Sequence, residues 1–229
     1  PISPYGNDYD RPILIMNTMR INDIHILDEG NQIVGFAGST LFELETKLKT
    51  YNREPHSVIG SSCIGASIVG GVCNNSGGAL VKRGPAYTEL SLYAKIDSNS
   101  NLVLVNELGI NLGNEPEEIL KNLELKSYTK NDVIFNEKLA SDNEYSARIR
   151  NVEAKTPARF NADTRRLNGA SGCAGKVVVF AVRLDTYPVP KVNKVFYLGT
   201  NNPHILGKIR KHILSSFKNL PVSGEYLHK

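Results

Sequence analysis

The chain contains 229 residues, of which 41% are hydrophobic and 22% charged, and its formal net charge is +4. These proportions are those of an ordinary soluble globular protein, and the length allows one large or two small domains with a substantial core. The positive charge is small and scattered, and aromatic residues do not alternate with basic ones, so nucleic-acid binding is not indicated. The sequence shows no signal-peptide or transmembrane pattern.

The first part of the chain predicts a strand, a hairpin and a helix. The predicted segments are a buried strand over residues 12–17, a β-hairpin formed by residues 24–27 and 33–36, and a helix over residues 41–49. Thr40 and Glu43 have the spacing of a capping box, in which the threonine oxygen and the glutamate carboxylate each accept a backbone N–H of the other residue. Asn52 is the expected stop of this helix.

A glycine-rich stretch at residues 59–78 is the segment around which the rest of the chain is organised. Its glycines stand at positions 60, 65, 70, 71, 77 and 78, and its serines at 61, 62, 67 and 76. Bare backbone N–H groups, serine hydroxyls and the N-terminus of a short helix over residues 64–72 favour the binding of a phosphate or a dinucleotide. A helix packed closely on a sheet, a mobile loop and a weak membrane helix remain open as alternatives. Neither G-x-G-x-x-G nor G-x-x-x-x-G-K-[ST] occurs, so spacing alone does not decide.

The remainder of the chain predicts further strands and helices around a polar excursion. The predicted segments are a hairpin of residues 90–96 and 102–105, a helix over 116–123 with Asn114 as N-cap, a polar excursion over 124–170 with a weak helix near 143–153, strands over 175–184 and 195–198, and a helix from Pro203 to about Phe217. Strands outnumber helices and come as hairpins. The expected fold class is therefore α+β, with a largely antiparallel sheet and flanking helices.

The sequence contains no convincing catalytic constellation. The five histidines are dispersed without H-x-x-x-H or H-E-x-x-H spacing, so no metal site is predicted, and only His56 has an interesting position, just before the glycine-rich stretch. Cys63 and Cys173 lie among glycines, but no histidine is linked to either by a sequence pattern. Three cysteines without a C-x-x-C pair are typical of buried thiols in a reducing compartment. If the protein is an enzyme, a bound cofactor carries the chemistry.

Several long strings of residues together resemble those of one known family. One is Gly-Gly-Val-Cys-Asn-Asn-Ser-Gly-Gly at residues 70–78, and the others lie at residues 4–11, 59–67, 83–89, 156–163, 171–176, 180–186 and 220–228. Together they resemble the family of bacterial respiratory, quinone-dependent D-lactate dehydrogenases, which are flavoproteins of the vanillyl-alcohol-oxidase (PCMH-type) FAD-binding superfamily. The resemblance runs nearly from end to end. It implies that residues 1–229 form most of the second subdomain of an FAD-binding domain.

The resemblance also implies site residues, a cofactor and partners. Carried over by position, Gly60, Ser67, Gly77 and Val179 are the expected FAD contacts, through close backbone approach at the glycines, the serine hydroxyl, and the backbone N–H and C=O groups of a strand. The parent enzyme is expected to oxidise D-lactate to pyruvate and to pass electrons to a membrane quinone. It is expected to be a peripheral protein on the cytoplasmic side of the bacterial inner membrane. No catalytic residue for lactate is expected within the chain.

The chain is expected to be a fragment. A first FAD-binding subdomain is expected before residue 1, and the substrate cap and a basic membrane-docking region after residue 229. Two other interpretations stay open. The parent enzyme oxidises another 2-hydroxy acid, such as glycolate, or the chain is a folded module that binds no flavin alone, because half of a cleft cannot bury the ligand.

Overall fold

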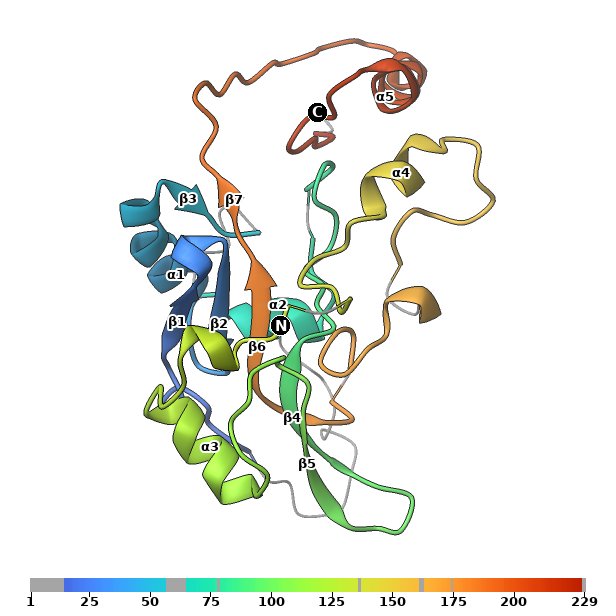
Figure 1. The fold of residues 1–229 in the computed structure, drawn as a ribbon. Helices are drawn as coiled ribbons and strands as arrows, with labels where there is room; N and C mark the ends of the chain where they lie inside the picture. Colours follow the sequence, from blue (N-terminus) through green and yellow to red (C-terminus); the bar gives the residue numbers. More distant parts are fainter. Residues whose placement is uncertain are drawn as a thin grey trace.

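The computed structural model describes residues 15–56, 65–77, 79–135, 137–160, 163–173 and 175–227. Its centre is a five-stranded sheet in the order β1-β2-β6-β4-β5, in which each neighbouring pair is antiparallel (Figure 1). The strands are β1 (Ile24–Leu27), β2 (Gln32–Phe36), β4 (Ser91–Ile96), β5 (Leu102–Asn106) and β6 (Val178–Asp185). A small second sheet pairs β3 (Arg53–Glu54) with β7 (Tyr187–Pro188). The predicted α+β class with a largely antiparallel sheet is confirmed.

Helices cover both faces of the central sheet. The helices are α1 (Leu41–Leu48), α2 (Ile68–Cys73), α3 (Pro116–Glu124), α4 (Tyr145–Arg150) and α5 (Pro203–Ser216). Because side chains alternate along a strand, Ile33 and Val182 pack with the buried residues of α1 and α2, whereas Val34 and Ala181 pack with those of α3. The glycine-rich stretch therefore meets the sheet on the face that α1 also covers.

The local signals near the start of the chain form the elements that they predict. Thr40 accepts the backbone N–H of Glu43 at 3.1 Å, and the Glu43 carboxylate accepts the N–H of Thr40 at 2.8 Å, so the capping box of α1 is complete. After α1 the chain makes a short 3-10 turn over Lys49–Tyr51. This turn ends at Asn52, the expected stop, whose backbone is left-handed with a φ of 53°. Both predicted hairpins and the last helix are also confirmed, and the Asn202 side chain caps α5.

Two predictions near the N-terminal side of the sheet are wrong. Residues 15–17, the described part of the predicted first strand, are not in a strand, and Ile15 is 87% exposed. The rest of that segment, residues 12–14, lies outside the described residues. Helix α2 begins at Ile68, so it is shorter than the predicted helix over residues 64–72.

Two further boundaries differ from the prediction. The N-cap of α3 is Glu115, without a side-chain cap, and Asn114 instead donates its backbone N–H to the Glu118 carboxylate at 3.1 Å. Strand β6 begins at Val178 and not at residue 175, because Gly175 has a positive φ of 78° that ends the preceding turn. Both errors shift an element's end and leave its type unchanged.

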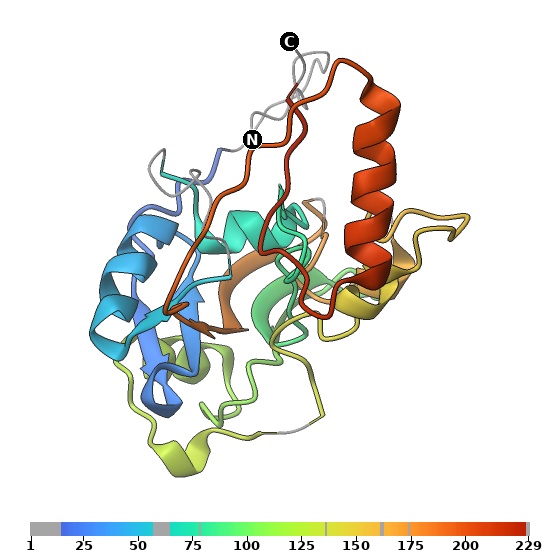
Figure 2. The same ribbon diagram turned by 90° about the horizontal axis from the view of Figure 1, so that it is seen from above.

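Residues 195–198 are not the strand that their apolar character predicted. Phe196 and Tyr197 are 77% and 90% exposed. Figure 2 shows this segment running from the sheet toward α5, which lies apart from the sheet and beside α4. Strand propensity is realised only against a neighbouring strand, and within the described part of the chain these residues pair with none. Where α4 ends, Arg150 holds α5 by donating to the carbonyl of Phe217 at 2.7 Å.

The polar excursion over residues 124–170 is ordered by a buried carboxylate. The predicted weak helix near 143–153 is confirmed as the shorter α4. The Asp142 side chain is fully buried and accepts from Nε and Nη2 of Arg166, at 2.8 and 3.1 Å, and from the Arg148 guanidinium. It also accepts the backbone N–H of Tyr145 at 3.1 Å, where α4 begins. The ion pairs of Asp142, and not a stripe of apolar side chains, therefore hold this segment in place.

Candidate cofactor site

The glycine-rich stretch is fixed to the sheet through α2. Ser67 is the N-cap of this helix, and its hydroxyl oxygen accepts the N–H of Gly70 at 3.1 Å. The Ile68 N–H donates to the carbonyl of Ser39 at 3.0 Å, which ties α2 to the turn before α1. The helix buries three apolar side chains against the sheet: Ile68, Val69 and Val72. Helix α2 has only six residues. The predicted phosphate site at its N-terminus stays a prediction.

Three glycines around α2 leave open space where a side chain would stand. A Cβ added at Gly65, Gly71 or Gly175 has no neighbour within 4 Å among the described residues. Gly65 and Gly175 have positive φ values of 79° and 78°, so their backbone conformation favours glycine. Gly71 has no such reason, and glycine inside a helix costs about 1 kcal/mol relative to alanine. Among the described residues, nothing fills the space beside Gly71. In the sequence, Gly71 is only one glycine of the stretch, and no pattern marks Gly175 as a site residue.

Gly77, a predicted FAD contact, is enclosed by protein. A Cβ at this position would lie 2.9 Å from Cα of Pro85 and 1.9 Å from Nη1 of Arg159. The surrounding turn is held by the N–H of Ala86, which donates to the carbonyl of Ser76 at 2.6 Å. Close packing against Pro85 and Arg159 therefore explains why this residue is glycine, a different reason from the predicted cofactor approach. Whether its backbone also contacts FAD stays a prediction.

Val179, the predicted contact in the strand, lies beside an irregularity of the sheet. Its side chain packs in the same cluster as the apolar residues of α2. In the pairing of β4 with β6, Tyr93 faces Val179 but Leu92 faces Ala181, so Phe180 is an extra residue. A bulge of this kind interrupts the ladder between β4 and β6, and the Phe180 carbonyl accepts the N–H of Ala37 at 2.9 Å. The structure thus places Ser67 and Val179 on adjoining elements, whereas Gly60 lies outside the described residues.

His56, the histidine next to the glycine-rich stretch, is buried beside a charged side chain. The Arg83 guanidinium donates to the carbonyls of Pro55 and His56, at 2.9 and 3.3 Å, and forms an ion pair with Glu54. Burial first, and then the charge of Arg83, lower the pKa of His56 to about 4. The imidazole is therefore neutral at physiological pH and packed into the fold. Among the described residues, no three His, Cys, Asp or Glu side chains are placed to hold a metal ion.

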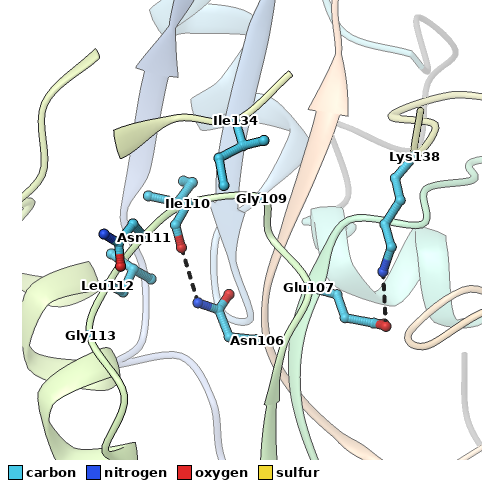
Figure 3. Close-up of a pocket in the computed structure, with 9 residues that line it drawn as sticks. All are labelled: Asn106, Glu107, Gly109, Ile110, Asn111, Leu112, Gly113, Ile134 and Lys138. Carbon is cyan, nitrogen blue, oxygen red and sulfur yellow. Dashed lines mark hydrogen bonds and ion pairs between the residues drawn. The ribbon is translucent and has the colours of Figure 1, made fainter. Parts of the chain in front are cut away.

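A polar depression of about 390 Å³ lies on the other face of the sheet (Figure 3). Its lining residues are Asn106, Glu107, Gly109, Ile110, Asn111, Leu112, Gly113, Ile134 and Lys138. Glu107 and Lys138 form an ion pair of 2.9 Å across its edge. Ile110 and Leu112 belong to the cluster under α3, so this depression is separated by the sheet from α2 and the open glycines. Arg183 is fully buried beneath it and donates to the carbonyls of Gly109 and Ile134.

The comparisons with known proteins show which proteins this chain is similar to. Residues 195–229 match the family described as D-lactate dehydrogenase, membrane binding. This match lies inside the chain, before the position at which the resemblance leads us to expect the basic membrane-docking region.

Three curated relatives are similar to the chain over nearly its whole length. The chain is 56% identical over 227 residues to the quinone-dependent D-lactate dehydrogenases of Escherichia coli (strain K12) and Haemophilus influenzae, with 99% of the chain and 40% of each relative covered. The enzyme of that name from Corynebacterium glutamicum is 43% identical over 224 residues, which are 98% of the chain and 39% of the relative. The chain thus spans about 40% of the length of these relatives. The chain is therefore similar to quinone-dependent D-lactate dehydrogenases, the proteins that its sequence strings resemble.

Proposed function

We propose that the chain is the FAD-binding portion, together with the start of the membrane-binding region, of an enzyme that oxidises D-lactate to pyruvate and reduces a membrane quinone. The observation that carries this proposal is the 56% identity over 99% of the chain to relatives named quinone-dependent D-lactate dehydrogenase. In the proposed arrangement, residues up to the start of the membrane-binding match form the second subdomain of a PCMH-type FAD-binding domain. The enzyme docks on the cytoplasmic side of the inner membrane.

The residues around α2 fit FAD as a ligand. The cofactor supplies an acceptor for the hydride of the substrate α-carbon. The chain's own task is to hold it: the open positions at Gly65, Gly71 and Gly175 give room for close approach, and the Ser67 hydroxyl retains a proton to donate. Val179 is the predicted contact of strand β6, whose backbone N–H and C=O groups would meet a ring edge. With Gly60 and Gly77 as further predicted contacts, these residues orient the flavin and exclude water from one side of it.

Substitutions at Gly71 test the placement of the cofactor in the intact enzyme. Gly71→Leu is expected to lower the flavin bound per chain at least tenfold, because the side chain would fill the open space against α2. Gly71→Ala is the matched control for folding, since alanine favours the helix by about 1 kcal/mol over glycine. Flavin content follows from visible absorbance after desalting, and thermal unfolding monitors the fold. A fully flavinated, normally folded Gly71→Leu enzyme would refute this placement.

The substrate is tested on the same preparations. D-lactate should bleach the flavin absorbance of the wild-type enzyme under anaerobic conditions, and a soluble quinone should restore it. L-lactate and glycolate serve as comparison substrates. Faster bleaching by glycolate than by D-lactate would assign the enzyme to another 2-hydroxy acid.

The segment after β7 has the composition of a membrane-docking surface. Residues 189–224 contain six Lys and Arg residues and no Asp or Glu. Exposed apolar side chains accompany them: Val192, Val195, Phe196, Tyr197 and Leu198. Cationic side chains are attracted to anionic headgroups, and aromatic rings settle at the interface between headgroups and acyl chains. No helix in the described ranges is long and apolar enough to cross a membrane, so peripheral docking through this segment is the mode that we propose.

Phe196→Ser tests the docking surface. The variant is expected to bind vesicles that contain phosphatidylglycerol several-fold more weakly than the wild-type enzyme, as measured by co-sedimentation. Phe42→Ser is the matched control, because Phe42 on α1 is similarly exposed, at 61% against 77% for Phe196. Added salt should weaken binding of the wild-type enzyme. Equal loss in both variants, or equal binding to uncharged phosphatidylcholine vesicles, would contradict docking through this basic segment.

A further inference from the structure

Two cysteines that are 100 positions apart in the sequence meet at the end of α2. Cys73 is the last residue of the helix, and Cys173 lies in the turn that leads to β6. The N–H of Gly172 donates to the carbonyl of Val72 at 3.1 Å. Cys173 follows Gly172 and Cys73 follows Val72, so this bond brings the two cysteines close together. A disulfide needs Cα atoms about 4.4–6.8 Å apart, a range that adjacent hydrogen-bonded backbones provide.

The two thiols lie near one another in a half-buried position. Both side chains pack against the core cluster formed by α1, α2 and the sheet. Each thiol perturbs the titration of the other: the partner thiol and the backbone N–H of Gly175 lower the pKa of Cys173 to about 6, while the partner thiol and burial raise the pKa of Cys73. The lower pKa of Cys173 favours its sulfur as the attacking thiolate.

We propose that Cys73 and Cys173 form a dithiol that a hydroperoxide oxidises to a disulfide joining α2 to the turn before β6. The Cys173 thiolate attacks one peroxide oxygen, the O–O bond breaks, and a sulfenic acid and hydroxide form. The Cys73 sulfur then attacks the sulfenyl sulfur, giving the S–S bond, and the proton of Cys73 leaves with the hydroxyl as water. Hydrogen peroxide gains the two electrons that the thiols lose.

The disulfide would link the elements that carry Ser67 and Val179. Helix α2 is held to β6 by apolar packing and the backbone bond of Gly172, and the covalent link would add a constraint across 100 residues of chain. Closing so long a loop restricts the unfolded chain strongly. Oxidation should therefore raise the apparent thermal midpoint reversibly. This inference needs only the two thiols and does not depend on the proposed substrate or cofactor.

Peptide mapping of the intact enzyme after treatment with hydrogen peroxide tests the proposal. Trypsin releases Cys73 in a peptide of residues 54–82, which also contains Cys63, and Cys173 in a peptide of residues 167–176. A Cys63→Ser variant removes the ambiguity between the two partners. We expect the cross-linked pair of peptides in the wild-type enzyme and in Cys63→Ser, with loss of the cross-link after dithiothreitol, and no cross-link in Cys173→Ser.

Three results would overturn the proposal. The first is that Cys73 and Cys173 alkylate equally before and after peroxide treatment. The second is oxidation of Cys173 to sulfinic or sulfonic acid without a cross-link in folded Cys63→Ser enzyme. The third is a cross-link that disappears in Cys63→Ser. An upward shift of the thermal midpoint with peroxide in Cys63→Ser, absent in Cys173→Ser, would support it.

Discussion

Replacing Asp142 by alanine is expected to lower the free energy of unfolding by about 3–5 kcal/mol, because removal of one partner leaves buried charges uncompensated. The carboxylate is fully buried and pairs with Arg148 and Arg166. It also accepts the N–H of Tyr145 at the beginning of α4. Urea unfolding monitored by circular dichroism measures the change. Both proteins are fitted with one common m value, the slope of the unfolding free energy against urea concentration.

Glu144→Ala is the matched control for Asp142. Glu144 contacts the same two arginines, with a distance of 2.6 Å to Nη2 of Arg166, but its side chain is 66% exposed. Exposed ion pairs contribute about 0–1 kcal/mol, so the control should stay within that range. A loss below 1 kcal/mol in Asp142→Ala would show that the pairing does not organise the excursion over residues 124–170.

The stability of the fold is expected to fall by about 3 kcal/mol between pH 6.5 and pH 4 through His56 alone. Its pKa is lowered from 6.5 to about 4 in the folded chain by burial and by the charge of Arg83. Between pH 6.5 and 4, His56 is therefore protonated in the unfolded chain but mostly neutral in the folded one. Each pKa unit corresponds to about 1.36 kcal/mol, so the contribution is complete above pH 6.5 and lost as the pH falls to 4. Burial also lowers the pKa of His25, which acts with the same sign.

His56→Gln isolates this contribution because glutamine does not titrate. The variant should show a flatter loss of stability over the same pH range, measured by urea unfolding at each pH. His212→Gln is the control for replacing a histidine by glutamine, since His212 is exposed on α5. If His56→Gln kept the full slope between pH 6.5 and 4, the buried imidazole would not be its source.

The sequence alone determined the elements whose signals are local. A capping box at Thr40 and Glu43, an Asn202 cap before Pro203, and alternating apolar residues in two hairpins each stabilise a helix or strand through neighbours a few positions away. The α+β class follows from these elements. Similarity of long strings over the chain was also visible in the sequence, and the relatives confirm it.

Only the tertiary structure decided the features that join distant segments. The open space at Gly71 and the close packing at Gly77 look alike in the sequence, because a glycine pattern does not say what stands beside each Cα. The meeting of Cys73 with Cys173 depends on α2 lying on the sheet next to the approach to β6. Residues 195–198 failed as a strand for the converse reason. Their propensity is local, but a strand requires a partner, and partners are assigned by the whole fold.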